Sequence, residues 1–251
     1  MPDPHKRAVQ TEFERAAGGF ARRTAGRFDV LEVPSFARVQ PEAVVAEVGA
    51  GTGNFLSLFS DVAARLIAVD LTPGMLAHAR DRNGRIEAVV ADGARLPLRS
   101  ESIDLIAIAQ TLHHIWEPLV VLKEMRRTMK SDGSLVIVDQ VAPESYEQAA
   151  AMNKLETIRD PSHAVSRPSS AFRILANSAG LEVVDQRLAE VTQRFSEWMG
   201  TDEFPPERIA AVQEFIERHG ERTGMSWTRV GDDWVYVRTR IMMLAKRAGG
   251  T

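Results

Sequence analysis

Apolar and amphipathic segments alternate along the middle of the chain, beginning at Ala43. The apolar segments are continuously hydrophobic, which is typical of strands in a parallel sheet whose two faces are both covered by helices. They are residues 43–48, 65–70, 86–91, 102–110 and 134–140. The pattern therefore predicts an α/β fold with a doubly wound, mostly parallel sheet.

The same pattern marks helix ends. Thr72 followed by Pro73 predicts a helix start, because threonine caps helices and proline fits their first turn. Residues 117–130 carry a helical face of Leu119, Leu122, Met125 and Met129, and Gly133 follows where that helix is expected to end.

Both flanks of this core depart from the alternation. The apolar spacing in residues 10–40 predicts Arg-rich helical segments, with a buried stripe formed by Phe13, Ala16, Ala17 and Phe20. Residues 181–191 and 233–245 are β-rich, and we expect them to close the sheet as an antiparallel pair. The predicted organisation is an N-terminal helical cap over residues 1–40 and one domain over 41–251, with lid insertions at about 143–168 and 200–232. The sheet is expected to be Rossmann-like and seven-stranded, with an antiparallel C-terminal strand.

The amino-acid composition excludes several classes of function. The 251 residues carry 31 Lys and Arg against 34 Asp and Glu, a net charge of −3, which lacks the basic excess typical of nucleic-acid binders. The absence of cysteine excludes disulfides, thiolate nucleophiles and cysteine-ligated metals. The N-terminus has no apolar signal segment, and no run of about 18 apolar residues could span a membrane. We therefore expect a cytoplasmic protein with neither nucleic acid nor membrane as partner.

A glycine-rich turn follows the first predicted strand. Glu47 ends the strand, and Gly49, Gly51 and Gly53 follow at alternate positions. Glycines let the backbone approach a ligand closely. The spacing differs from the G-x-G-x-x-G turn that binds dinucleotide pyrophosphate, and an acidic side chain beside the turn suits a ligand that carries an ammonium group.

Acidic residues also end the next two predicted strands, at Asp70 and Asp92. Ligands of open α/β sheets bind outside the carboxyl ends of the strands, so Glu47, Asp70 and Asp92 are expected to line one crevice. Asp70 is placed to accept two ribose hydroxyls, and Asp92, followed by Gly93, to accept an amino group of adenine. Helix capping is the alternative explanation for each acid taken singly.

These residues, with the fourth strand ending in Gln110-Thr-Leu-His-His114, resemble the class I S-adenosylmethionine-dependent methyltransferases. More narrowly, they resemble the small-molecule branch related to ubiquinone/menaquinone biosynthesis C-methyltransferases and natural-product O-methyltransferases. The resemblance runs from about residue 10 to 200. It implies that S-adenosylmethionine is the cofactor, held by Glu47, Gly49, Ala50, Gly51, Gly53, Asp70, Leu71, Met75, Asp92, Gly93 and Gln110.

One position departs from the family pattern. Relatives often have a tyrosine near position 20 that reaches the cofactor carboxylate, whereas this chain has Phe20. Arg15, Arg22 and Arg23 are alternative partners for that carboxylate, although each also fits a solvated helix face.

Methyl transfer from a sulfonium requires alignment and removal of the acceptor's proton, and it needs no covalent enzyme intermediate. His113 and His114 follow the fourth strand at the crevice rim, and an imidazole can take that proton. Because neighbours in extended chain point opposite ways, one of the two is expected to act as base and the other to bind loop backbone. Asp139, ending the fifth strand, is a second base or an orienting group, and Asp160 and His163 in the insertion are further candidates, which rest on the resemblance.

No metal is expected, because the His, Asp and Glu candidates lack the spacing of a dedicated site. Tryptophan, methionine and phenylalanine residues in the variable segments favour a small apolar or aromatic acceptor, methylated at O, N or C. They include Trp116, Trp198, Trp227, Trp234, Met152 and Met225. The apolar faces of the insertions also leave a homodimer open.

Two other functions remain open on these residues. One is an NAD(P)-dependent oxidoreductase, since Asp70 lies 21 residues after Gly49, a workable distance for ribose binding. The other is a non-catalytic S-adenosylmethionine-binding regulator, because fold and function are separable.

Overall fold

The computed structural model describes residues 3–24, 26–28, 31–200 and 204–249. Its strands are β1 (Ala43–Val48), β2 (Ala63–Asp70), β3 (Ile86–Val90), β4 (Ile103–Ala109), β5 (Met129–Gln140), β6 (Leu181–Arg194), β7 (Ser226–Val230) and β8 (Asp233–Arg247). Its α-helices are α1 (Pro4–Arg23), α2 (Val33–Ala37), α3 (Pro73–Arg82), α4 (Pro118–Thr128), α5 (Tyr146–Arg159), α6 (Ser169–Ser178), α7 (Phe195–Met199) and α8 (Pro206–His219). Shorter 3₁₀ helices are η2 (Leu56–Phe59), η3 (Leu112–His114) and η4 (Gly220–Thr223).

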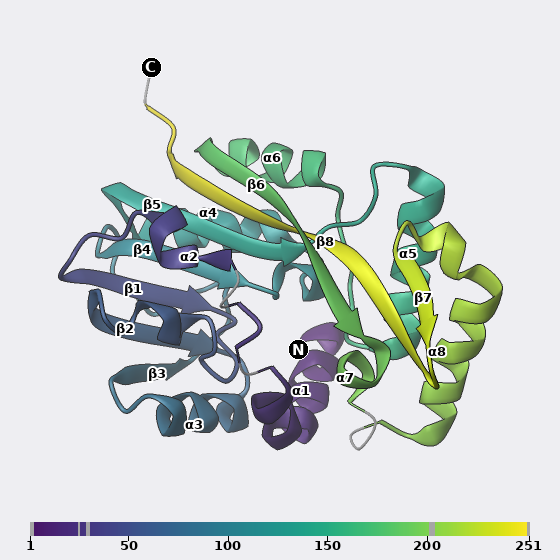
Figure 1. Cartoon of the computed structure of the whole chain (residues 1–251). Helices are drawn as coiled ribbons and strands as arrows, with labels where there is room; N and C mark the ends of the chain where they lie inside the picture. Colours follow the sequence, from purple (N-terminus) through teal and green to yellow (C-terminus); the bar gives the residue numbers. More distant parts are fainter. Residues whose placement is uncertain (1–2, 25, 29–30, 201–203, 250–251) are drawn as a thin grey trace.

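The described strands form one mixed sheet in the order β3-β2-β1-β4-β5-β8-β6 (Figure 1). The first five of these are parallel, and β8 runs antiparallel to both β5 and β6. This confirms the predicted Rossmann-like fold and its antiparallel C-terminal pair. An eighth strand, β7, pairs with β8 outside that order, and its mostly exposed residues gave no apolar run to predict it from.

Helices cover both faces of the sheet, as the continuous apolar strands require. One face packs against α2, η2 and α3, which contribute Phe36, Phe59 and Leu76 to its core. The other face packs against α4 and α6, with Leu122 and Phe172 among its buried side chains. The segment between β1 and β2, which is amphipathic in sequence, contains only the 3₁₀ helix η2.

A third apolar cluster lies away from the parallel strands. It combines residues of α5, α7 and α8 with Tyr236 of β8, and Trp198 and Tyr236 lie at its centre with ring centroids 5.3 Å apart. Figure 1 shows these helices gathered on the side of the sheet where β8 extends past β5. The insertions therefore build their own small core.

Several predicted boundaries hold and one is wrong. Helix α3 begins at Pro73 as expected, but the Thr72 side chain makes no capping hydrogen bond. Met129, predicted on the face of a helix, is instead the first residue of β5, because the chain enters the sheet there and pairs Met129 with Ile103. Gly133 consequently lies within β5. The division at residue 40 remains a prediction, and residues 201–203 of the second predicted insertion lie outside the described residues.

Candidate functional site

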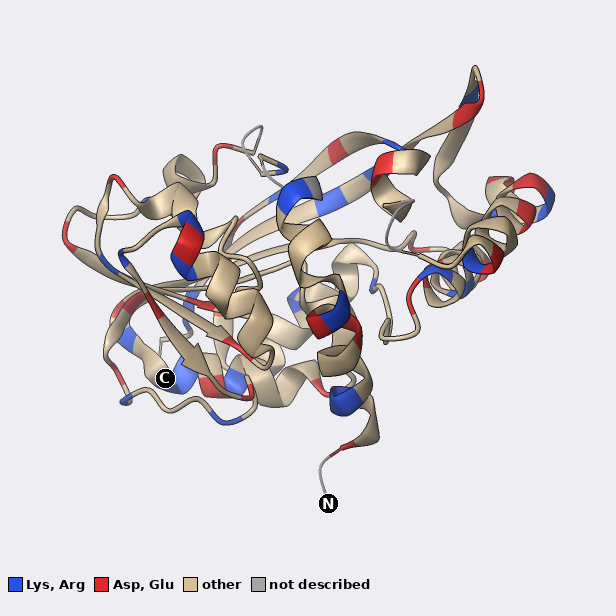
Figure 2. Cartoon of the chain, turned by 90° about the horizontal axis from the view of Figure 1, so that it is seen from below, with Lys and Arg blue, Asp and Glu red and all other residues tan. Residues whose placement is uncertain are grey.

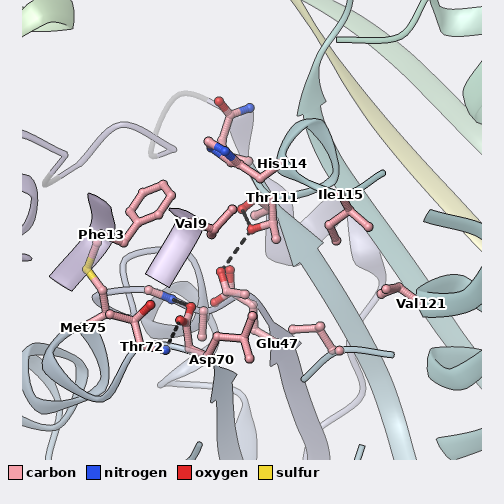
Figure 3. Close-up of a pocket in the computed structure, with 18 of the residues that line it drawn as sticks. Val9, Phe13, Glu47, Asp70, Thr72, Met75, Thr111, His114, Ile115 and Val121 are labelled. Atoms are coloured by element: carbon pink, nitrogen blue, oxygen red, sulfur yellow. Dashed lines mark hydrogen bonds between the residues drawn. The ribbon is translucent and has the colours of Figure 1, made fainter. Parts of the chain in front are cut away.

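A pocket opens at the carboxyl ends of β1, β2 and β4 and beneath α1 (Figure 3). Its lining includes ten of the residues expected around the cofactor: Glu47, Gly49, Ala50, Gly51, Asp70, Leu71, Met75, Asp92, Gly93 and Gln110. Gly53 is the exception. A Cβ there would lie 3.0 Å from the Ala79 Cβ, so this glycine allows the turn to pack against α3.

Glu47 lies at the floor of the pocket and is only 1% exposed. One of its oxygens, Oε2, accepts a hydrogen bond from the Leu56 backbone N–H at 3.0 Å. Burial raises the pKa of this carboxyl well above its usual range. A cationic ligand group beside Glu47 would favour the ionised carboxylate.

Asp70 is fixed by two backbone donors. Its Oδ2 accepts from Gly51 N–H and its Oδ1 from Thr72 N–H, both at 2.8 Å (Figure 3). Burial raises the pKa of Asp70, and these two hydrogen bonds oppose that rise. Each oxygen keeps a further lone pair for a ligand hydroxyl.

The glycine turn brings bare backbone to the same place. Gly49 has a φ of +70° and a Cβ there would lie 2.3 Å from the Thr111 Cγ2, so neither the conformation nor the space admits a side chain. Gly51 has a φ of +52°, and a Cβ there would meet no atom within 4 Å. The open space beside Gly51 is where a ligand can approach the backbone.

Helix α1 closes the pocket from the opposite side, and Figure 2 shows both acidic and basic positions along it. Lys6 Nζ lies 2.5 Å from Asp92 Oδ2. Gln10 Nε2 donates to the Leu71 carbonyl at 2.9 Å, and Glu14 Oε2 accepts from Gly74 N–H at 3.1 Å. Polar contacts thus fasten the helix to the strand-end loops after β2 and β3.

The two adjacent histidines lie on η3 rather than in extended chain, so their rings are neighbours, with centroids 4.3 Å apart. The expectation that they point opposite ways is wrong, because a 3₁₀ turn does not alternate its side chains. His113 Nδ1 lies 2.6 Å from Asp139 Oδ1. Since a carboxylate only accepts, His113 donates from Nδ1, and in the neutral form of the ring Nε2 carries the lone pair.

His114 lines the pocket and packs against Phe13, with ring centroids 5.0 Å apart. Its Nδ1 donates to the Ser162 carbonyl at 3.0 Å. Burial, together with the neighbouring His113, lowers the pKa of His114 to about 4. His114 is therefore neutral near pH 7.

The other candidates from the insertion lie behind these histidines. His163 Nε2 donates to Asn153 Oδ1 at 2.8 Å, and burial lowers its pKa to about 2. Asp160 accepts from the Ser162 backbone N–H and hydroxyl. Burial alone would raise the pKa of Asp160, but His114 and Arg159 bring it to about 2. Neither side chain lines the pocket described above, and of the two adjacent histidines only His114 belongs to its lining.

The arginines proposed for the cofactor carboxylate differ in placement. Arg15 donates to Glu12 Oε1 at 2.6 Å, Arg22 is exposed, and the side chain of Arg23 lies outside the described residues. Arg27, which the sequence did not single out, lines the pocket. Its guanidinium carbon lies 4.7 Å from the centroid of the Phe28 ring.

Known proteins similar in sequence to this chain include methyltransferases. A family model described as "Methyltransferase domain" matches residues 46–137. The uncharacterised methyltransferase YcgJ of Bacillus subtilis is 27% identical over 179 residues, covering 68% of this chain and 70% of that protein. The ubiquinone/menaquinone biosynthesis C-methyltransferase UbiE of Campylobacter jejuni is 25% identical over 144 residues, covering 53% of this chain and 61% of the enzyme.

Solved structures show the same fold. A protein of Bacillus halodurans described as a methyltransferase superposes with a TM-score of 0.79 at 23% identity, covering 88% of this chain and 99% of that one. The YcgJ structure gives the same TM-score at 21% identity, covering 89% of this chain and 98% of that one.

This chain belongs to the class I S-adenosylmethionine-dependent methyltransferases. S-adenosylmethionine is the methyl donor of that family, and the methyltransferase assignment replaces the oxidoreductase and regulator alternatives. Because the alignment with UbiE spans less than two thirds of that enzyme, its substrate is not carried over.

The aromatic and methionine residues expected to wall the methyltransferase's acceptor site divide into two groups. Five of them pack in the core of the insertions and not in the pocket: Trp198, Trp227, Trp234, Met152 and Met225. Trp116 is 59% exposed and lies at the pocket lining near His5, with ring centroids 5.6 Å apart.

Two negative observations complete the description of the methyltransferase. Within the described residues, no three His, Asp or Glu side chains converge in a way that could hold a metal ion. None of the described helices has the length and apolar character needed to cross a bilayer.

Proposed function

We propose that this methyltransferase moves a methyl group from S-adenosylmethionine to a small organic acceptor by direct displacement, with a histidine removing the acceptor's proton. The observation that carries the proposal is that Glu47, Asp70 and Asp92, from the ends of three neighbouring strands, surround one pocket beside the open backbone of Gly51. A ligand with an ammonium group, a ribose diol and an adenine amino group offers one hydrogen-bonding group to each of these three acids.

Each acid has a stated role in this proposal. Glu47 holds the amino end of the cofactor, and its buried carboxyl becomes ionised beside that cation. Asp70, fixed by Gly51 and Thr72, accepts both ribose hydroxyls. Asp92 accepts the adenine amino group, which requires Lys6 to give up one oxygen. Met75, which is 1% exposed, covers the adenine face.

Arg27 takes the place of the missing tyrosine in the proposal. It lines the pocket, and its charge influences the buried carboxyl of Glu47. A cation at this end of the pocket complements the cofactor carboxylate, as the helix arginines were expected to do. Phe20 then serves as an apolar wall below the Arg27 guanidinium, whose carbon is 5.4 Å from the Phe20 centroid.

S-adenosylmethionine, when bound, supplies an electrophilic methyl group on a sulfonium sulfur. The chain must therefore exclude water, align the acceptor and take its proton. We assign the proton transfer to His113, whose Nε2 carries the lone pair while Asp139 holds the ring through Nδ1. His114 acts as a positioning residue, because its hydrogen bond to the Ser162 carbonyl ties η3 to the insertion. His163 and Asp160 support it indirectly, through hydrogen bonds within the insertion.

The decisive test follows methyl transfer from S-adenosylmethionine labelled in its methyl group across a panel of small hydroxylated and aromatic metabolites. We expect label transfer by the wild type and about a hundredfold to ten-thousandfold lower kcat for His113→Gln. Affinity for S-adenosylhomocysteine should be unchanged in that variant. Exposed His219→Gln is the matched control. Normal turnover by His113→Gln would remove the histidine from the mechanism, and absence of transfer to every acceptor would contradict the proposal.

A further inference from the structure

Buried polar atoms without hydrogen-bond partners gather at the cofactor pocket, where Gln110 and Arg27 lie, and at the edge of the sheet beyond it. Among the described residues they include Gln110 Nε2, Asp139 Oδ2 and the Nε atoms of Arg27, Arg238 and Arg240. These residues are close in the fold. Gln110 N–H donates to the Val138 carbonyl at 2.7 Å, and Arg240 pairs with Gln140 across the β5–β8 ladder. A buried polar group left without a partner is costly, so a concentration of them indicates a ligand.

Positive charge is in excess at this edge. Arg240 is 3% exposed, and the hydrogen bond from its Nη1 goes to the backbone carbonyl of Arg27 at 3.1 Å. Arg238 is 8% exposed and donates to Gln140 Oε1 at 2.6 Å and to Glu156 Oε1 at 3.3 Å. Among the described residues, Glu156 is the carboxylate in direct contact with Arg238, and no carboxylate makes an ion pair with Arg240.

The other acids nearby are already engaged. Asp139 holds His113, and Glu47 accepts from Leu56 and is shifted toward its neutral form by burial. Burial and the charge of Arg238 lower the pKa of Arg240 to about 10. Burial and the charge of Arg240 lower the pKa of Arg27 to about 9. Both guanidinium groups stay charged near pH 7, and the charge of Asp139 offsets their mutual repulsion only in part.

The two β8 arginines belong to the acceptor side of the site. Arg27 lines the cofactor pocket, whereas Arg238 and Arg240 are absent from its described lining. Arg238 contacts Glu156 of α5, and its partner Gln140 donates to Ser166 Oγ of the insertion at 2.7 Å. Asp139, which orients the proposed base, contributes to the electrostatic environment of Arg240. Arg240 lies one position along β8 from Ile241, the ladder partner of Asp139, so an acceptor held beside His113 would approach this edge of the sheet.

We propose that Arg240, assisted by Arg238, binds an anionic oxygen group of the methyl acceptor, so that the substrate class of this enzyme is a small organic acid. The inference rests on the proposed function, since it places the acceptor beside His113. Guanidinium groups bind carboxylates through charge-assisted, often paired hydrogen bonds. The orphaned Gln110 amide adds a further donor. Arg27 stays with the cofactor carboxylate.

The test measures thermal unfolding with acetate, benzoate or phosphate at constant ionic strength, with the enzyme saturated by S-adenosylhomocysteine. Arg240→Met, Arg240→Lys and the exposed control Arg218→Met are compared with the wild type. We expect at least one anion to raise the wild-type midpoint in a saturable way. The apparent affinity should fall about tenfold to a hundredfold in Arg240→Met, fall less in Arg240→Lys, and stay unchanged in Arg218→Met.

Stability without ligand gives a second readout. If Arg240 serves binding and not stability, Arg240→Met removes a buried charge that neighbouring arginines repel. The thermal-unfolding midpoint without ligand should then stay level or rise. A lower midpoint combined with no anion effect in the wild type would show a structural arginine and overturn the proposal. Should Arg240→Met fail to fold, the comparison of Arg240→Lys with the wild type decides.

A second titration distinguishes an acceptor anion from the cofactor's own carboxylate as the ligand of these arginines. It uses 5′-methylthioadenosine, which lacks that carboxylate, in place of S-adenosylhomocysteine. Under the proposal the anion stabilises the enzyme equally with either nucleoside bound. If the anion only competes with S-adenosylhomocysteine for binding, the arginines belong to the cofactor site, and this would overturn the proposal. The shift caused by S-adenosylhomocysteine itself, in wild type and Arg240→Met, tests the proposed function independently.

Discussion

Gly49 shows how one residue can be fixed by both conformation and space. Its φ of +70° disfavours any side chain, and the Thr111 side chain occupies the position of a Cβ. We expect Gly49→Ala to lower the free energy of unfolding by more than about 1 kcal/mol, because alanine at a positive φ is strained and Thr111 must also move. Urea unfolding measures this. Gly84→Ala, where a Cβ meets no atom within 4 Å, is the control, and equal losses in both variants would contradict the explanation.

His114 links the site to pH. Its folded pKa of about 4 lies below the ordinary 6.5, so the folded state prefers the neutral ring. Its contribution to stability is complete above pH 6.5 and is lost as pH falls toward 4, because the unfolded chain then binds more protons. We expect His114→Asn, which keeps a donor for the Ser162 carbonyl, to lose part of this pH dependence. Urea midpoints between pH 7 and 4.5 measure it, with His219→Asn as control. Parallel curves for His114→Asn and the wild type would assign the acid sensitivity to other groups.

At the residue scale, the sequence predicted the site residues that lie at the ends of strands. Glu47, Asp70 and Asp92 each end a continuous apolar run, and the carboxyl edge of a parallel sheet brings such ends together. Arg27 and Lys6 gave no comparable signal, because their placement depends on where α1 and the turn after it dock. Arg238 and Arg240 carried a signal that was missed: two arginines two positions apart in an otherwise apolar strand.

At the scale of elements, α1 is the helix whose contacts must change when the proposed cofactor binds. Its Lys6 holds the Asp92 oxygen that the adenine amino group is proposed to need, although both side chains are more than a third exposed. An exposed ion pair contributes about 0–1 kcal/mol. We therefore expect Lys6→Ala to raise the affinity for S-adenosylhomocysteine by up to about fivefold, as measured by titration calorimetry. Exposed Lys154→Ala is the control, and weaker binding by Lys6→Ala would show that Lys6 supports the ligand instead.

Most strands and helices could be predicted because their apolar runs match the period of the element. The exceptions are residues whose structure is set by a pairing or a turn and not by an apolar run. Strand β7 exists through its hairpin with β8, and Met129 belongs to β5 because the distant Ile103 pairs with it. The extended interpretation of residues 112–114 was wrong because the chain turns into η3 as it leaves β4, and the Ile115 N–H donates to the Leu112 carbonyl.

At the scale of the whole molecule, two bodies of structure meet at the site. The sheet with its covering helices supplies the cofactor pocket, and the insertions supply a separate apolar core that carries the groups behind His113 and His114. The fold class followed from the sequence, whereas the meeting of α5, β8 and η3 did not, because it depends on side-chain packing between distant segments.

The central claim is that Asp70 and its neighbours form the cofactor site. Calorimetric titration with S-adenosylhomocysteine tests it on the wild type, Asp70→Asn and the exposed control Asp132→Asn. We expect one site per chain in the wild type and Asp132→Asn, and affinity at least about tenfold weaker in Asp70→Asn, because charged hydrogen bonds to the ribose are lost. Equal affinity in all three proteins, or binding of NAD in place of S-adenosylhomocysteine, would contradict the account.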